Sequence, residues 1–508
     1  MRKKVNLAVI AALIITGASA DVMVSATTVE SHTDGKSIGL NLWGENKHYT
    51  DDLTVNVSGL GVNGTKYHNN VTGIYALEGS QVDIDKNVTV KVINPAPAES
   101  GEKRRSDLAH YYMSGIYAGY GGDVGYGTFD DTRVTVKGNA NVDVVGVGLQ
   151  VNKDGYLRIL GGADVKTYPL DTSDTYSAVS EEGFLYVNTG MDGLQPGTND
   201  VKMYGNVGFL DKNYGIDINP HKHGSFISLG LTTPNSKLVG GVLNEFDESN
   251  NNPYHGGLRL YLQNGATWRN EWLGAERVYP TQGRPDSANY LYTGSKVEHL
   301  IGGTNKGSLG IIQPVDVRPI TVNNYAGHTA IDYLNGSPAA EYGKGEVVIN
   351  HADPGSSVTL RSSVEALKEQ ANAEILGLAE NQFAKKLVYT GYTKGEKNLD
   401  VNLKLDTGVI SPTLNAKLSA DDFDKDGRAM VSDKTTLTTS ESDIVSGAKS
   451  ALASSVMQMR ADTNDLQRRL GDVRMNSDNQ GVWGKYIGGK SKITDSAYVN
   501  QNYNMAQI

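Results

Sequence analysis

Residues 422–433 contain the spacing of oxygen ligands that a calcium ion needs. Asp422, Asp424 and Asp426 precede Gly427, and Asp433 takes the place of the glutamate that usually closes such a loop. Convergent carboxylates around a glycine turn suit a hard cation. The flanking residues do not read as helices, however, so the sequence favours an acidic turn in a linker and this loop is a weak candidate only.

A second pair of possible ligands is His221 and His223, whose spacing would place two imidazoles on one face of a strand. The pair follows Asn219-Pro220 and precedes Gly224, which favours a loop tip over a metal site.

Motifs for enzymatic chemistry are absent. The sequence has no Gly-x-Ser-x-Gly elbow, no His-Glu-x-x-His helix and no phosphate-binding Gly-x-x-x-x-Gly-Lys-Ser/Thr loop, and it has no cysteine. We therefore predict no cofactor and no catalytic residue. A pair of catalytic carboxylates scattered over several strands stays open, because Asp and Glu are too common here to single any out.

Composition narrows the class of protein. The 508 residues carry a net charge of -10, which argues against a nucleic-acid partner, and they include 59 glycines. A cysteine-free chain bound for an oxidising compartment has no disulfides, so its stability must come from repeated burial and hydrogen bonding.

The elements that must position any site are short strands of alternating polarity, separated by Gly, Asn and Asp. Clear examples are Val88–Val92, Val134–Lys137, Leu157–Ile159, Leu258–Leu262 and Val401–Leu405. The alternation predicts inward side chains at Val88, Val90, Val134, Val136, Leu157 and Ile159.

Loose repeats connect these strands. The stretch from Gly73-Ile74-Tyr75-Ala76 to Val88-Thr89-Val90 aligns with that from Gly115-Ile116-Tyr117-Ala118 to Val134-Thr135-Val136, and again with 146–160. A unit that cannot bury its own apolar face is typical of a solenoid, so we expect an all-β, right-handed parallel β-helix. A β-sandwich is the alternative, but the strands continue for some 330 residues without a clear linker, and bulky aromatic residues are few.

The N-terminus is typical of a secretory signal. Arg2, Lys3 and Lys4 precede an apolar run at residues 5–15, and Ala18-Ser19-Ala20 fits a signal peptidase, so we expect cleavage after Ala20. The apolar run is too short for a transmembrane anchor, which needs about 20 residues.

The C-terminal part carries a family resemblance. A small-residue helix expected from Ser442 to Arg474, with Asp465-Leu466-Gln467-Arg468-Arg469-Leu470, precedes Gly481-Val482-Trp483-Gly484-Lys485-Tyr486. This order resembles the junction of helix and barrel in classical autotransporters (type V secretion). Upstream, Gln263-Asn264-Gly265-Ala266-Thr267-Trp268 and the stretches 296–300 and 320–327 resemble the C-terminal passenger coils of pertactin-like members. The segment Leu273–Gly294 is an insertion relative to that pattern.

These features predict five parts of the chain. They are a signal peptide (1–20), a β-helix passenger (21–255), autochaperone-like C-terminal passenger coils with a helical patch at 364–386 (256–440), a linker or pore helix (441–475) and the incomplete start of an outer-membrane β-barrel (476–508). Polar insertions at 94–112 and 244–256 are expected as surface loops, where a partner could bind.

The resemblance implies a passenger exported across the inner membrane and displayed at the bacterial surface or secreted, through its own barrel and the barrel-assembly machinery. We expect a non-enzymatic adhesin that binds a host surface, a matrix component or other cells. A passenger enzyme that degrades glycans or proteins on a β-helix scaffold is the alternative.

Overall fold

The computed structural model of the chain describes a defined subset of its residues. These are 22–24, 27–31, 37–57, 71–92, 113–119, 131–152, 155–168, 175–181, 183–209, 225–244, 256–274, 277–278, 290–333, 345–363, 384–393, 399–406, 413–418, 422–431, 435, 437–440, 445, 447–460, 485–493 and 499–507. The expected signal peptide and most of both polar insertions lie outside the described residues.

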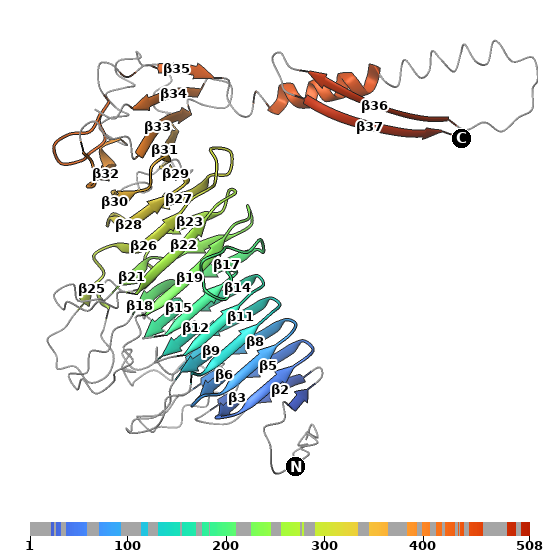
Figure 1. Cartoon of the computed structure of the whole chain (residues 1–508), viewed down its shortest axis with the longest axis vertical. Coiled ribbons are helices and arrows are strands. Elements are labelled where there is room, and N and C mark those ends of the chain that lie inside the picture. The colour runs from blue at the N-terminus through green and yellow to red at the C-terminus, as the bar shows by residue number, and fades with distance from the viewer. Residues whose placement is uncertain are drawn as a thin grey trace, which may run out of the picture. The chain divides into compact units, whose positions relative to one another are not determined.

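The described chain divides into two units, the first made of residues 1–329 and 344–351 and the second of residues 330–343 and 352–508. Unit 1 is built from three sheets of stacked strands, which confirms the expected β-solenoid pattern (Figure 1). Up to residue 244 each coil of the chain adds one strand to each sheet in turn, and later coils extend the first two sheets. Paired strands of these sheets run parallel in unit 1.

The first sheet follows the order β1 (Val22–Val24), β4 (Asn46–Tyr49), β7 (Gln81–Ile84), β10 (Arg133–Val136), β13 (Tyr156–Ile159), β16 (Phe184–Val187), β19 (Phe226–Leu231), β22 (Gly257–Leu262), β26 (Ser295–Ile301), β28 (Ile320–Ala326) and β30 (Val347–Ala352). The second sheet follows β2 (Thr27–Ser31), β5 (Leu53–Val57), β8 (Val88–Val92), β11 (Ala140–Val145), β14 (Ala163–Tyr168), β17 (Val201–Tyr204), β20 (Lys237–Val239), β23 (Thr267–Asn270), β27 (Gly310–Pro314) and β29 (His328–Asp332). The third sheet follows β3 (Ser37–Trp43), β6 (Val71–Leu77), β9 (Met113–Gly119), β12 (Val147–Asn152), β15 (Tyr176–Glu181), β18 (Asn206–Phe209) and β21 (Val242–Asn244).

The core of unit 1 is a set of aliphatic columns inside the three sheets. In the first sheet Val82, Val134 and Leu157 are in register. They are almost completely buried, as are all six side chains that the alternation placed inward: Val88, Val90, Val134, Val136, Leu157 and Ile159. The prediction of these inward positions is therefore confirmed.

The strand register corrects one part of the repeat alignment. Ile74 does pair with Ile116, as aligned, but Val88 pairs with Ala140 in the second sheet, whereas Val134 pairs with Val82 in the first. The alignment of Val88–Val90 with Val134–Val136 was therefore wrong by one strand. Two short strands of similar alternation follow each other in every coil, so polarity alone does not tell them apart.

Glycine marks the place where the third sheet approaches the second. A β-carbon at Gly115 would lie 2.3 Å from Val142 Cγ1 and 2.6 Å from the Gly148 carbonyl oxygen, and one at Gly73 would meet Val90 Cγ1 at 2.2 Å. Because no side chain fits there, the Gly-Ile-Tyr-Ala repeat records a close contact between sheets.

The described ends of the insertion at residues 273–294 pack against the third sheet. They include the antiparallel pair β24 (Arg277–Val278) and β25 (Tyr290–Leu291). Trp272 and Tyr292 stack at 4.1 Å and form a small core with Val147, Tyr176, Val179 and Leu243. The insertion leaves the coil intact, because β23 and β26 keep their places in their sheets.

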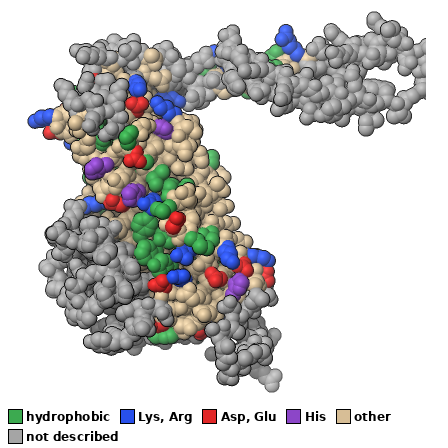
Figure 2. All heavy atoms as spheres, in the orientation of Figure 1, with side chains coloured by type: hydrophobic (Ala, Val, Ile, Leu, Met, Phe, Trp, Pro, Cys, Tyr) green, Lys and Arg blue, Asp and Glu red, His purple; other side chains and the backbone are tan. Residues whose placement is uncertain are grey.

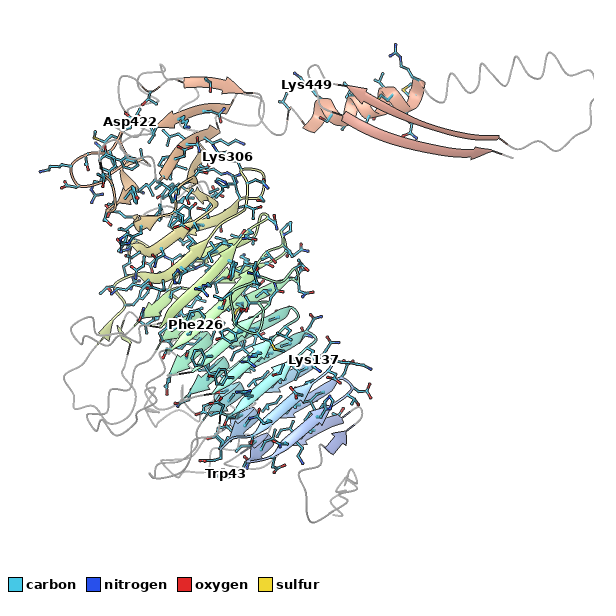
Figure 3. All side chains as sticks on the ribbon, in the orientation of Figure 1. Trp43, Lys137, Phe226, Lys306, Asp422 and Lys449 are labelled. Atoms are coloured by element: carbon cyan, nitrogen blue, oxygen red, sulfur yellow. The ribbon has the colours of Figure 1, made fainter. Side chains whose placement is uncertain are left out.

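On the face of unit 1 that Figure 2 shows, hydrophobic side chains gather in a group in the middle, together with Lys, Arg, Asp and Glu side chains. Trp43, at the N-terminal part of this unit, is 58% exposed (Figure 3).

Unit 2 contains β31 (Ser356–Ser363), the 3-10 turn η2 (Ala384–Lys386), β32 (Leu387–Tyr389), β33 (Leu399–Asp406), β34 (Thr413–Leu418), β35 (Leu437–Ser440), β36 (Lys485–Ile493) and β37 (Val499–Gln507). β31 pairs in parallel with β33, whereas the pairings β33–β34, β34–β35 and β36–β37 are antiparallel.

Two helices were expected in this unit. Residues 447–460 are helical, within the helix expected from Ser442, and residues 461–484 lie outside the described part. Residues 364–383 of the expected helical patch also lie outside it, and its last three residues form η2. Among the described residues, no helix is long and apolar enough to span a membrane.

Candidate functional site

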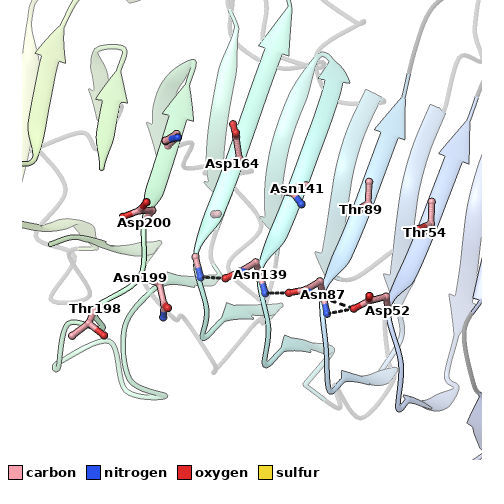
Figure 4. Close-up of a pocket in the computed structure, with 13 residues that line it drawn as sticks. Asp52, Thr54, Asn87, Thr89, Asn139, Asn141, Asp164, Thr198, Asn199 and Asp200 are labelled. Atoms are coloured by element: carbon pink, nitrogen blue, oxygen red, sulfur yellow. Dashed lines mark hydrogen bonds between the residues drawn. The ribbon is translucent and has the colours of Figure 1, made fainter. Parts of the chain in front are cut away.

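A row of Asp and Asn side chains runs across the turns that lead into the second sheet. Asp52 Oδ1 accepts hydrogen bonds from the backbone N–H of Asn87 at 3.0 Å and from its Nδ2 at 3.1 Å. Asn87 Oδ1 in turn accepts the N–H of Asn139 at 2.9 Å, and Asn139 Oδ1 accepts the N–H of Gly162 at 2.7 Å (Figure 4). We call this row the Asp–Asn ladder. It satisfies backbone donors at turns that no strand pairing reaches.

Beside the Asp–Asn ladder lies a groove of about 690 Å³ on the outer face of the second sheet. Its floor is a column of outward residues in register on successive strands: Thr54, Thr89, Asn141, Asp164 and Lys202. Its borders are formed by the ladder and by the loop before β17. The complete lining is Asp52, Thr54, Asn87, Thr89, Asn139, Asn141, Gly162, Ala163, Asp164, Thr198, Asn199, Asp200 and Lys202 (Figure 4).

Each coil positions one floor residue through the same local pattern. The inward neighbours Leu53, Val88 and Ala140 are buried, so the next residue on each strand must point outward. Parallel strands lie about 4.8 Å apart, and the floor side chains are therefore spaced regularly along the groove.

The polar groups of the groove differ in how many hydrogen bonds and ion pairs they already form within the protein. Asp200 accepts hydrogen bonds from Thr233 Oγ1 and Asn235 Nδ2. Among the described residues, Asp164 Oδ1 is buried without a hydrogen-bond partner, and Oδ2 lies 3.6 Å from Lys166 Nζ. Thr54, Thr89 and Asn141 add neutral donors and acceptors. The groove can therefore offer a row of hydroxyl, amide, carboxylate and ammonium groups to a polar ligand.

Charged groups also bridge the coils on the turns next to the groove. The carboxylate of Asp85 accepts hydrogen bonds from Lys137 Nζ at 2.7 Å and from His48 Nε2 at 2.9 Å. Both bonds lower the pKa of Asp85, and its contact raises the pKa of Lys137. These pairs are solvent-exposed, so they contribute little to the free energy of unfolding. They join the turns of neighbouring coils.

The acidic loop singled out in the sequence is a tight turn between short bridges in unit 2. Asp424 Oδ1 accepts the backbone N–H groups of Asp426 at 2.8 Å and of Arg428 at 2.9 Å, and Gly427 has a φ of 76°. Phe423 bridges Ala429, and Asp422 is 5% exposed. Asp433 lies outside the described residues. One carboxylate oxygen of this loop thus serves backbone amides, as in an Asx turn.

His221 and His223 also lie outside the described residues. Within the described part of the chain, no group of three or more His, Asp or Glu side chains could hold a metal ion.

The groove residues were not singled out from the sequence. A signal for the Asp–Asn ladder was present, since Asn87 and Asn139 each precede a strand after a turn residue. Asp52 and Asn87 are 35 residues apart in sequence, and Asn87 and Asn139 are 52 apart. Only the strand register brings these side chains together.

No protein-family model, no curated protein and no solved structure matches this chain.

Proposed function

We propose that this chain is an autotransporter passenger whose right-handed β-helix displays a binding groove at the bacterial cell surface. The observation that carries the proposal is the polar groove along successive coils of the second sheet. An in-register row of polar groups on a rigid column suits an extended ligand with repeating hydroxyl groups, and a carbohydrate chain has that chemistry. The protein then acts as a non-enzymatic adhesin.

Export is the part of the proposal that rests on the family resemblance. By that resemblance, the helix that includes residues 447–460 lies in the pore of an outer-membrane barrel, and β36 and β37 are the first strands of that barrel. The hairpin alone leaves strand edges that lipid does not tolerate, so a complete barrel and its assembly machinery are needed. The test joins the chain to a complete barrel of this family and labels intact cells. Passenger that stays inside the cell would contradict the proposal.

Binding is tested with a glycan array, two groove variants and one matched control. Lys202 and Lys237 are in register on neighbouring strands, but only Lys202 lines the groove. We expect Lys202→Gln and Asn141→Ala to weaken binding to the glycans that the wild type retains by about tenfold, the effect of one or two lost hydrogen bonds with a charged partner. Lys237→Gln should bind as the wild type does. Equal binding by all three variants would remove the groove from the proposal.

A glycan-degrading enzyme is the second candidate, because Asp52, Asp164 and Asp200 all line the groove. Two carboxylates that flank a glycosidic bond can act as acid and base. Incubation of bound glycans with the protein, followed by measurement of new reducing ends, separates the two functions. Cleavage by the wild type that is lost in Asp164→Asn would favour the enzyme.

A further inference from the structure

A second feature of unit 1 lies on the outer face of the first sheet. Aromatic and arginine side chains occupy neighbouring outward positions on five successive strands, from β10 to β22. We call this set the aromatic–arginine strip; it consists of Arg133, Tyr156, Arg158, Phe184, Tyr186, Phe226 and Arg259. Figure 3 marks Phe226 in the middle of unit 1, the part where Figure 2 shows hydrophobic and charged side chains together.

The rings of the strip are stacked across coils. Tyr156 and Phe184 lie 4.8 Å apart with an angle of 11° between their planes. Tyr186 packs edge-on against Phe226 at 6.1 Å. These rings lock one another in place, so the strip is rigid before any ligand arrives.

The same rings hold the arginines. The guanidinium of Arg158 lies 5.2 Å from the ring centre of Tyr156 and 5.9 Å from that of Tyr186, and Arg259 lies 5.3 Å from that of Phe226. The Nε atom of Arg158 is covered, so its two Nη groups are the donors left for a ligand. An arginine that is already ordered loses little side-chain entropy on binding.

The acidic groups near the strip are hydrogen-bonded to groups other than Arg158 and Arg259. Asp131 pairs with Arg133 at 2.8 Å. Asp192 accepts the N–H of Leu194, and Glu298 accepts Nδ2 of Asn323 and Asn324. Within the described part of the chain, Arg158 and Arg259 form no ion pair, so their guanidinium groups can pair with an anionic ligand.

A short loop forms a wall at the end of the strip nearest β22. The Tyr261 hydroxyl donates to the Leu194 carbonyl oxygen at 2.6 Å, and Ser228 Oγ donates to that of Gly193 at 2.8 Å. The loop is therefore fastened to the sheet, while Met191 and Leu194 remain 59% and 50% exposed.

We infer that the aromatic–arginine strip binds an anionic polysaccharide, one that carries carboxylate or sulfate groups. The unpaired arginines match these groups in charge and in bidentate geometry. A peptide fits less well, because the strands of the strip are paired on both sides and offer its backbone no free hydrogen-bonding edge. A sugar chain can rest its C–H groups on the ring edges and keep its hydroxyls in water.

The strip is separate from the groove, so failure of this inference leaves the proposed function standing, and the two sets of variants tell them apart. The test measures binding of the full chain to immobilised heparin, which is sulfated, to polygalacturonate, which is carboxylated, and to neutral dextran. We expect binding to one or both anionic polymers, weakened by salt, and none to dextran. The arm that binds identifies the anionic group.

The double variant Arg158→Gln/Arg259→Gln should bind the anionic polymer about a hundredfold more weakly, since each lost charged contact accounts for about tenfold. The charge-preserving Arg158→Lys, which keeps an aliphatic stem on the rings, should lose about tenfold or less. Arg269→Gln, on the second sheet and paired with Glu271, is the control. Variants that bind as the wild type does, or poly-glutamate that binds as tightly as the polysaccharide, would overturn the inference.

Discussion

Trp268 is the largest fully buried side chain described, and its Nε1 donates to the Gly240 carbonyl oxygen at 3.0 Å. We expect Trp268→Ala to lower the free energy of unfolding by about 3–5 kcal/mol, because it leaves a cavity and an unpaired carbonyl. Trp43→Ala, at a position 58% exposed, should change it by about 0.5 kcal/mol or less. Urea unfolding of both variants is the measurement, and similar losses in the two would contradict the burial of Trp268.

Tyr325 links stability to alkaline pH. Burial raises its pKa, although hydrogen bonds with Thr329 act in the opposite direction. The unfolded chain therefore loses this proton first, at about pH 10, so the stabilising contribution is complete below that pH and declines as the pH rises further. The decline is about 1.4 kcal/mol per pH unit for each such tyrosine.

Tyr325→Phe removes this proton linkage. We expect the variant to be less stable than the wild type near neutral pH by about 1 kcal/mol, through loss of the bond to Thr329, and to lose stability less steeply above about pH 10. Urea midpoints measured across that range decide the matter. Parallel pH curves for the two proteins would show that Tyr325 does not contribute.

Some features of single residues could be predicted from the sequence, and others could not. Val134 and Leu157 were placed inward correctly, because alternation along a strand is a local property. The stacking of Arg158 between Tyr156 and Tyr186 was not foreseen. It depends on which strands become neighbours, and one-strand errors in the repeat alignment destroy that information.

At the scale of elements, the turns are held by a different kind of contact from the strands. Asn139 belongs to the Asp–Asn ladder and fixes the N–H of Gly162, whereas Asn141 points into the groove. We expect Asn139→Ala to destabilise the protein by about 1 kcal/mol and to speed hydrogen exchange of the Gly162 amide.

Asn141→Ala is the matched control for this prediction. It should leave exchange at Gly162 unchanged and affect binding instead. Faster exchange at Gly162 in both variants, or in neither, would show that the ladder does not fix this turn.

The Asp-rich turn of unit 2 shows that one short motif fits two kinds of turn. Asp424 binds two backbone amides, and Gly427 adopts a positive φ that favours glycine. Calcium loops use aspartate and glycine at the same spacing for a similar backbone bend. The sequence therefore predicts the turn without saying whether a cation lies in it.

At the scale of the molecule, the coils of unit 1 should be interchangeable. Leu149 pairs with Ile116, so Gly148 takes the place of Gly115 one coil further on. Deleting residues 115–147 joins Ser114 to Gly148 and removes one strand from each sheet. We expect this variant to keep a cooperative thermal transition, because each coil contacts only its neighbours.

Deletion of residues 115–131 is the control for the deletion of residues 115–147. It removes most of β9 alone and puts the following strands out of register, so it should abolish cooperative unfolding followed by circular dichroism. If both deletions unfold alike, unit 1 does not behave as a stack of equivalent coils.

The whole-molecule features that the sequence predicts best are those that repeat. Stacked coils follow from alternation and from the glycine repeat, whereas the third strand in each coil does not, because β7 and β8 have similar polarity. The signal peptide and the residues between the C-terminal helix and β36 lie outside the described part, so those expectations remain predictions.

The parallel pairing of unit 1 also has a mechanical consequence. Hydrogen bonds between coils are evenly spaced and slanted, and they join each coil to the next along the column. A pulling force applied along the column would therefore load these bonds one row at a time and peel the coils in sequence at low force. In a single-molecule experiment, the coil from Gly115 to Gly148 would release about 110 Å of chain per step. A protein anchored at a surface in flowing liquid would then yield gradually under tension and re-form coil by coil when the tension falls.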